Sequence, residues 1–283
     1  MEKFTNWRDK GTGIAPFLPP SVGSIGVASM VGYIVLSVLK TILISPLVAV
    51  YVLTGSKPLF GLIAYILFDW KVDVTVQGVK RRLLNKREHY PHENAVYLCN
   101  SSSAVDAHVL DSIANGEPSF LIARDNQLFK MSKSQYMQFA LDGSLNVKKY
   151  GKEIHSIEKS SGQVTFIFPE GTCSNGKTVL PFEIDEEHLA EFLEPLGSNV
   201  AVQVIHLKTN ASLTTPLRVS KWEFVSRAIV NGVHVKVKMH EPQGLRPLEK
   251  LRVVMNDGNK FKLVSKTLNV EAKRKFVEEY EKR

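Results

Sequence analysis

The sequence contains little cysteine and no dense group of metal ligands. Its 283 residues include two cysteines, Cys99 and Cys173, which are too few for a disulfide framework and suit a reducing compartment. The eight histidines are scattered, and no pair of cysteines has zinc spacing. No internal repeat or low-complexity tract is present. These absences exclude a disulfide-stapled secreted domain, a zinc module and a repeat protein.

Charge is almost missing from one long N-terminal run. From Ser24 to Thr54 the only charged residue is Lys40, and Pro58–Phe68 is again uncharged. Residues 1–23 are polar and rich in glycine and proline, so we predict no cleavable signal peptide. One straight helix over 24–54 would measure about 46 Å, longer than the roughly 30 Å hydrocarbon core of a bilayer.

Three arrangements of this apolar run are open. Pro46 removes a helix hydrogen bond, so two arms meeting near Lys40–Pro46 would form a membrane hairpin. Basic residues on both flanks then place both ends in the cytosol. A single membrane span and a buried helix of a soluble core are the alternatives. We expect a polar segment 1–23, a membrane-embedded segment 24–69 and an α/β domain 70–283.

The composition is that of a globular, basic protein. Hydrophobic residues make up 44% and charged residues 23%, and the net charge is +8. A basic balance attracts phosphate groups of nucleic acid, of an anionic membrane or of a small substrate. The apolar N-terminal run disfavours nucleic acid, so we expect a membrane surface and a phosphorylated ligand.

Beyond residue 70, short apolar strands alternate with helical patterns. The predicted strands are Val72–Val76, Ala95–Cys99, Ser119–Ala123, Leu145–Val147, Gln163–Phe168, Val200–Leu207 and Val233–Met239. The predicted helices are Ala104–Ala114, Leu128–Leu141, Glu153–Lys159, Glu186–Leu196 and Val270–Lys282, the last with its charges on a solvated face. This alternation predicts an α/β fold with a mixed, largely parallel sheet flanked by helices.

Two polar stretches follow predicted strands. In "NSSSAVDAH", Ser103 and Asp106 have the spacing of a helix capping box, but the carboxylate would also suit a catalytic site. In "FIFPEGTCSNGK", glycines after Pro169 could let the backbone approach a phosphate, or form an ordinary turn. From the residues alone, the first stretch can be a helix cap or part of a catalytic site, and the second can be a phosphate-binding loop or an ordinary turn.

Taken together, the two stretches resemble the PlsC family of glycerolipid acyltransferases. The family motif Asn-His-x-x-x-x-Asp corresponds to Asn100, Ser101 and Asp106, and the motif Phe168-Pro169-Glu170-Gly171-Thr172 is intact. The segment from Gly143 to Lys149 is similar to the block that ends in a basic residue for the acceptor phosphate. The resemblance covers about residues 70–240. Residues 1–20 and "KFKLVS" at 260–265 also resemble fungal lysophosphatidic acid acyltransferases of lipid droplets.

The resemblance implies transfer of a long-chain acyl group from acyl-CoA to lysophosphatidic acid, at the endoplasmic reticulum and lipid droplet surface. Ser101 and Asp106 would then be the catalytic positions. The expected substrate-binding residues are Asn100, Gly143, Lys149, Phe168, Pro169, Glu170, Gly171 and Thr172, with Lys149 and Glu170–Thr172 in one phosphate pocket near Asp106. We expect no metal and no cofactor beyond acyl-CoA as co-substrate, a cytosolic catalytic domain and no nucleic-acid partner.

One departure from the family pattern leaves a second hypothesis open. Ser101 stands where the family has its histidine, and a hydroxyl cannot accept a proton near neutral pH as imidazole does. Cys173 follows Thr172 where the family often has arginine, and His108 is too close in sequence to Asp106 to share its helix face. The alternative is therefore a catalytically impaired relative that acts as a lipid-surface binding or regulatory protein.

Overall fold

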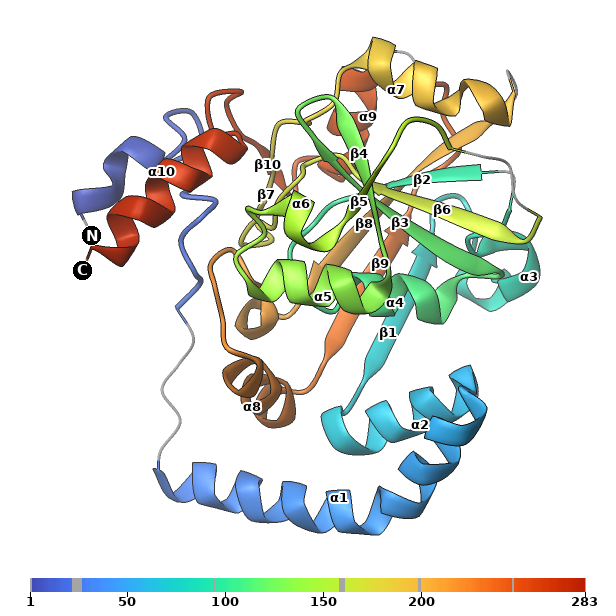
Figure 1. Cartoon of the computed structure of the whole chain (residues 1–283), viewed down its shortest axis with the longest axis vertical. Helices are drawn as coiled ribbons and strands as arrows, with labels where there is room; N and C mark the ends of the chain where they lie inside the picture. Colours follow the sequence, from blue (N-terminus) through green and yellow to red (C-terminus); the bar gives the residue numbers. More distant parts are fainter. Residues whose placement is uncertain are drawn as a thin grey trace.

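An eight-stranded sheet forms the centre of the domain, in the order β1-β9-β8-β2-β6-β3-β4-β5 (Figure 1). The computed structural model describes residues 2–21, 27–93, 95–157, 161–197, 200–245 and 247–282. The strands are β1 (Lys71–Val76), β2 (Ala95–Cys99), β3 (Glu117–Arg124), β4 (Gln127–Met131), β5 (Lys152–Ile154), β6 (Gln163–Phe168), β8 (Ala201–Thr209) and β9 (His234–Met239). Strands β8, β2, β6 and β3 pair in parallel, while β4 pairs antiparallel with both of its neighbours. The predicted fold class is confirmed.

Helices cover both faces of this sheet. One face packs against α4 (Asp106–Ile113), α5 (Lys133–Leu141) and α8 (Lys221–Asn231). The other packs against α7 (Glu186–Leu193) and α9 (Leu248–Met255). The smaller elements are η1 (Glu2–Trp7), η2 (Arg81–Leu83), α3 (Lys86–His89), α6 (Val147–Tyr150), β7 (Thr178–Val179), η3 (Glu194–Leu196), η4 (Ala211–Leu213) and β10 (Lys262–Leu263). Strands buried on both sides explain the continuous apolar runs of β2 and β6.

The predicted helix over Leu128–Leu141 is wrong in its first third. Asp125 and Asn126 both have positive φ and form a two-residue turn, so the chain returns along β3 as strand β4. Helix α5 begins only after Ser132, whose side chain forms a capping box with Gln135. Sheet pairing therefore overrides the helical pattern of residues 128–131.

Two further predictions around residue 150 are wrong. In place of the expected strand Leu145–Val147, residues 145 and 146 form a loop and Val147 begins helix α6 (Val147–Tyr150). The expected helix Glu153–Lys159 begins as strand β5, because residues 152–154 pair antiparallel with β4. Residues 158 and 159 of that prediction lie outside the described residues.

The apolar N-terminal run forms two helices, α1 (Val27–Thr54) and α2 (Lys57–Phe68), and residues 24–26 lie outside the described residues. The expected break at Pro46 is wrong. Proline cannot donate to the Ile42 carbonyl, but the Ser45 hydroxyl donates to it at 2.8 Å, so the helix continues. The chain turns instead at residues 55–56, where Gly55 has positive φ, and α2 folds back along α1 (Figure 1).

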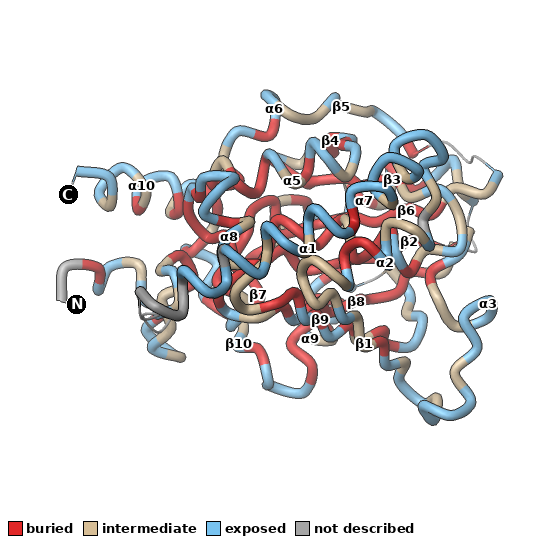
Figure 2. The backbone as a smooth tube through the Cα atoms, turned by 90° about the horizontal axis from the view of Figure 1, so that it is seen from below, coloured by how far each residue is buried: buried red, intermediate tan, exposed pale blue. Residues whose placement is uncertain are grey.

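Most of the described apolar residues of helix α1 are exposed, and Figure 2 colours the described part of the helix mainly as exposed and intermediate. Leu43 and Leu53 are 78% and 86% exposed. These exposures contradict the alternative of a buried core helix. By length and composition, Val31–Thr54 is able to cross a membrane.

The two ends of the chain pack against each other (Figure 1). Helix α10 (Val270–Glu281) presents Phe276, whose ring lies 5.4 to 6.0 Å from the ring centroids of Phe4, Trp7 and Phe17. The Asn175 side chain also donates to the Ala15 carbonyl at 2.9 Å. The N-terminal segment is therefore part of the α/β domain, although α1 and α2 separate it from that domain in sequence.

Candidate active site

The two polar stretches meet at the carboxyl ends of β2 and β6. These strands are parallel neighbours, so the loops that follow them leave the same edge of the sheet. The Ser101 amide donates to Glu170 Oε1 at 3.1 Å, and the Ser174 amide donates to the Ser101 carbonyl at 3.0 Å. Motifs about 70 residues apart in sequence thus form a single cluster.

Asp106 lies at the start of α4 and is fully buried. Its Oδ2 accepts hydrogen bonds from the amides of Ser102 and Ser103, each at 2.8 Å. Burial raises the pKa of Asp106 to about 7, although these hydrogen bonds favour the carboxylate. Ser103 does not complete the capping box, because the Asp106 amide donates to the Ser103 carbonyl and the Ser103 hydroxyl donates to the Leu213 carbonyl. Asp106 therefore holds the loop and is also able to exchange a proton near neutral pH.

The Ser101 side chain belongs to a short chain of polar groups. Its Oγ lies 2.8 Å from the Tyr136 hydroxyl and 3.1 Å from Cys173 Sγ. The Tyr136 hydroxyl in turn donates to Asp106 Oδ2 at 3.5 Å. Tyr136 was not among the predicted site residues. Its place depends on where α5 begins, which the Ser132 cap could have indicated.

The side chains of Asn100 and Glu170 both form hydrogen bonds with backbone groups. Both polar atoms of the Asn100 amide bond to Leu207 of the adjacent strand β8, at 2.6 and 2.9 Å. Glu170 accepts from the amides of Ser101 and Leu180, and burial raises its pKa to about 8. Both side chains therefore shape the loops from inside the protein.

The rest of the Phe-Pro-Glu-Gly-Thr motif is also buried in the loop. Phe168 stacks on the Tyr136 ring with centroids 4.6 Å apart, and the Pro169 carbonyl accepts from the Glu183 amide. Gly171 has φ +64°, and a Cβ there would overlap the Ala123 carbonyl oxygen. This position therefore requires glycine.

A third cluster joins Gly143–Ser144 to Thr172–Cys173. Gly143 and Ser144 have positive φ, which directs the Ser144 hydroxyl to Thr172 Oγ1 at 2.8 Å and to the Cys173 amide at 2.9 Å. Two buried cations brace this contact. Arg124 donates to the carbonyls of Leu145 and Gly171, and Lys273 of α10 donates to Ser144 and Thr172. Neither cation was predicted to be near the site.

Comparison with known proteins identifies the kind of chain that carries this site. The model of the family described as "Acyltransferase" matches residues 81–191. The chain is 42% identical to lysophosphatidic acid:oleoyl-CoA acyltransferase 1 of Saccharomyces cerevisiae, over 99% of this chain and 97% of the yeast protein. The chain belongs to the acyltransferase family. The resemblance inferred from the motifs is thereby confirmed.

A solved structure is also similar to this acyltransferase. The crystal structure of the 1-acyl-sn-glycerophosphate acyltransferase PlsC from Thermotoga maritima is 18% identical. The match covers 90% of the acyltransferase described here and 100% of the bacterial chain, with a TM-score of 0.38.

Lys149 is exposed, unlike the buried Phe-Pro-Glu-Gly-Thr motif. Its ammonium pairs with Asp142 at 3.0 Å and lies over the Tyr150 ring. His108 also lies elsewhere, stacked on Phe60 of α2, and burial lowers its pKa to about 4. As expected from its spacing, His108 does not replace the family's histidine.

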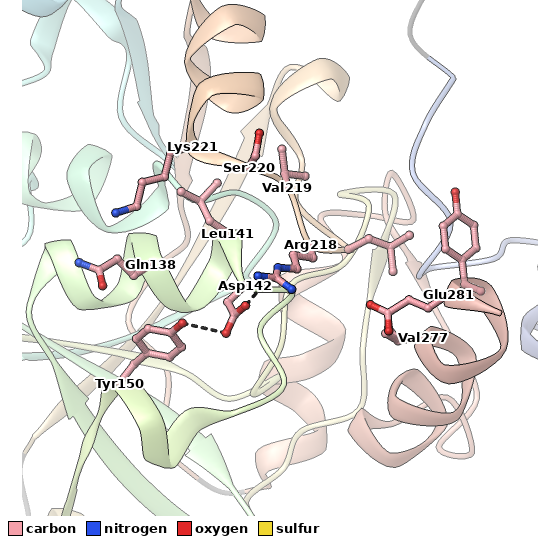
Figure 3. A pocket seen from close by; sticks show the side chains of 12 residues that line it. Gln138, Leu141, Asp142, Tyr150, Arg218, Val219, Ser220, Lys221, Val277 and Glu281 are labelled. Atoms are coloured by element: carbon pink, nitrogen blue, oxygen red, sulfur yellow. Dashed lines mark hydrogen bonds and ion pairs between the residues drawn. The ribbon is translucent and has the colours of Figure 1, made fainter. Parts of the chain in front are cut away.

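An open pocket of about 700 Å³ lies beside Lys149, between α5, the 217–221 loop and α10 (Figure 3). Asp142 projects into it and bonds to the Tyr150 hydroxyl at 2.8 Å and to Arg218 at 3.5 Å. Asp142 is two residues from Ser144, so the pocket adjoins the buried cluster. Ser101 and Asp106 are 2% and 0% exposed, however, so the structure is closed around them.

Proposed function

We propose that this protein is a membrane-bound acyltransferase that transfers a long-chain acyl group from acyl-CoA to lysophosphatidic acid, giving phosphatidic acid. The observation that carries the proposal is the 42% identity, over nearly the whole chain, to a yeast enzyme named for these two substrates. The association of Ser101, Asp106 and the intact Phe-Pro-Glu-Gly-Thr motif at one sheet edge supports it.

The direct test is an assay of the purified full chain in detergent or nanodiscs. Lysophosphatidic acid and oleoyl-CoA should yield phosphatidic acid and one free CoA thiol per turnover. Other lysophospholipids and acyl-CoAs would define the preference. If folded, membrane-bound protein forms no product from any pairing, it is not an acyltransferase of this type.

The reaction forms a carbon–oxygen bond to the glycerol hydroxyl and breaks the carbon–sulfur bond of the thioester. The hydroxyl proton must leave as the bond forms, and the CoA thiolate finally takes up a proton. We propose that Ser101, Tyr136 and Asp106 carry the hydroxyl proton, with Asp106 as the final acceptor. A carboxylate with a pKa of about 7 matches this role at neutral pH.

Tyr136→Phe tests this relay. Phenylalanine keeps the stacking on Phe168 but removes the hydroxyl between Ser101 and Asp106. Because positioned proton transfer contributes about 10²–10⁴-fold, we expect kcat to fall by about 10²-fold. Tyr97→Phe is the matched control, since Tyr97 is equally buried and its hydroxyl bonds to His92 instead. Equal kcat values for the two variants would exclude the relay.

We propose that the acceptor phosphate binds at the pocket beside Lys149 and Arg218. Both cations currently pair with Asp142, and a phosphate would offer them a second anionic partner. Gly143, Gly171 and Thr172 would shape the adjoining loops from inside. Asn100, Phe168, Pro169 and Glu170 would act on the substrates through those loops.

We propose that α1 and α2 form a membrane hairpin at the endoplasmic reticulum and on lipid droplets, with the α/β domain in the cytosol. The packing of Phe4, Trp7 and Phe17 on α10 supports a hairpin over a single span. A single span would place residues 1–21 on the opposite side of the membrane from α10. A hairpin also fits the monolayer of a droplet, which has one aqueous side.

Protease protection tests this topology. With a tag at each end, both tags should be digested in intact microsomes, because both ends face the cytosol. A luminal protein in the same preparation should stay protected until detergent is added. Protection of the N-terminal tag alone would mean that α1 is a single span.

A second candidate function follows from Ser101 and from the closed site. The family's base is replaced, and both catalytic positions are inaccessible to substrate in this conformation. A catalytically impaired relative would bind lipid surfaces through α1 and α2 without turnover. Vesicle flotation together with the acyl-transfer assay separates the two functions, because only the enzyme couples binding to CoA release.

A further inference from the structure

Lys273 is a charged side chain with 0% exposure. It comes from α10, the helix whose charges were expected to form a solvated face, and it contradicts that expectation. Its Nζ donates to Ser144 Oγ at 2.8 Å, to Thr172 Oγ1 at 2.8 Å and to the Cys173 carbonyl at 2.9 Å. An ammonium has three donors, so all three are used on two loops of the candidate site.

Burying an ammonium costs free energy unless hydrogen bonds or an opposite charge replace its hydration. Desolvation lowers the pKa of Lys273 to about 7, and no carboxylate pairs with it among the residues that the structure describes. The helix that delivers it is held by Phe276, which packs against Phe4, Trp7 and Phe17. The N-terminal aromatics thus fix α10 in the position that buries Lys273.

The three oxygens that Lys273 contacts belong to the segments that surround Ser101. Cys173 Sγ lies 3.1 Å from Ser101 Oγ, and the Ser174 amide bonds to the Ser101 carbonyl. Ser144 bonds to the Cys173 amide. A shift of Lys273 would therefore displace Cys173, and with it the groups beside Ser101.

The same face of α10 reaches the open pocket. Val277 and Glu281 follow Lys273 at intervals of four residues, and both line that pocket. Helix α10 therefore runs from the buried cluster around Ser144 and Thr172 to the proposed phosphate pocket. A movement of the helix would shift residues at both places.

We propose that Lys273 is a positioning residue of the acyltransferase site, which makes the C-terminal helix part of that site. It holds the Gly143–Ser144 turn against Thr172–Cys173, and this keeps the Cys173 side chain in contact with Ser101. The proposal rests on the proposed acyl transfer. Lys273 touches neither substrate in this role and acts through Ser144, Thr172 and Cys173.

The experiment compares Lys273→Met, Lys273→Arg and Lys275→Met in the full chain. Methionine has nearly the length of lysine without its charge, arginine keeps the charge, and Lys275 is an exposed lysine of the same helix. We expect Lys273→Met to lower kcat by about 10²-fold per folded molecule, the effect of a small misplacement of reacting groups. The KM for oleoyl-CoA should stay within about 2-fold, because Lys273 does not contact that substrate. Arginine should restore part of kcat, and Lys275→Met should equal the wild type.

Hydrogen exchange provides a readout that does not need turnover. In Lys273→Met the amides of Cys173 and Ser174 should exchange faster, while those of β2 stay protected. If folded Lys273→Met matches Lys275→Met in kcat per folded molecule, the residue is structural and the proposal fails. An inactive wild type would overturn the proposed function instead, and unchanged exchange at Cys173 would then reject the positioning role as well.

Discussion

Asp106→Asn is expected to lower kcat by about 10²–10⁴-fold while the protein stays folded. Asparagine keeps an oxygen for the amides of Ser102 and Ser103, so the loop retains its hydrogen bonds. It cannot take up a proton, so the relay through Tyr136 loses its final acceptor. Steady-state kinetics with lysophosphatidic acid and oleoyl-CoA, alongside circular dichroism, would measure both effects.

The pH dependence separates a catalytic Asp106 from a structural one. Because the base is the carboxylate, kcat of the wild type should rise with pH through about 7, and the asparagine variant should lack this rise. The folded-state pKa is raised above the unfolded value, so Asp106 contributes stability at low pH that is lost as pH rises from about 4 to 7. Relative to the wild type, the variant should gain stability over that range. Identical pH profiles would assign Asp106 a capping role alone.

Gly171→Ala should cost about 2–5 kcal/mol in the free energy of unfolding. The left-handed backbone costs a non-glycine residue about 1–2 kcal/mol, and overpacking against the Ala123 carbonyl adds about 1–3 kcal/mol. Gly162→Ala is the matched control, because Gly162 also has positive φ but a Cβ added there would meet open space. Chemical denaturation of both variants measures the difference.

The comparison isolates close packing from backbone conformation. If the two variants lose equal stability, the contact with Ala123 is not what requires glycine at position 171. The acyl-transfer activity of Gly171→Ala should fall together with its folded fraction, because the same loop carries Thr172 and Cys173. Full activity in a destabilised variant would mean that the loop tolerates displacement.

The strands that flank the site were predictable because they are buried on both faces. Residues 95–99 and 163–168 coincide with the predicted ranges, since a short apolar run ended by polar residues is a local pattern. Strands β4 and β5 were not predictable in the same way. Their residues become strands only through pairing with β3, and the Asp125–Asn126 turn that starts this pairing leaves a weak local signal.

The residues of the candidate site also fall into two groups, those that a local sequence pattern identifies and those that only tertiary packing brings in. The sequence alone identified Asn100, Asp106 and the Phe-Pro-Glu-Gly-Thr motif, because each follows a strand that local pattern defines. It also exposed the replacement of the family's histidine by Ser101. It could not place Tyr136, whose hydroxyl reaches Ser101 only once the α5 boundary and the packing of α5 are known.

The sequence by itself determined the fold class, the family and the apolar N-terminal run, since these depend on the periodicity and identity of neighbouring residues. Only the tertiary structure decided that the apolar run turns at residues 55–56, that the exposed Lys149 pairs with Asp142, and that Lys273 contacts Ser144 and Thr172. Lys273 and Thr172 are 101 residues apart. No local pattern encodes such a contact. The charge pattern of the helix predicts a solvent-exposed lysine, and Lys273 is buried only because the helix packs against the N-terminal aromatic residues and the domain.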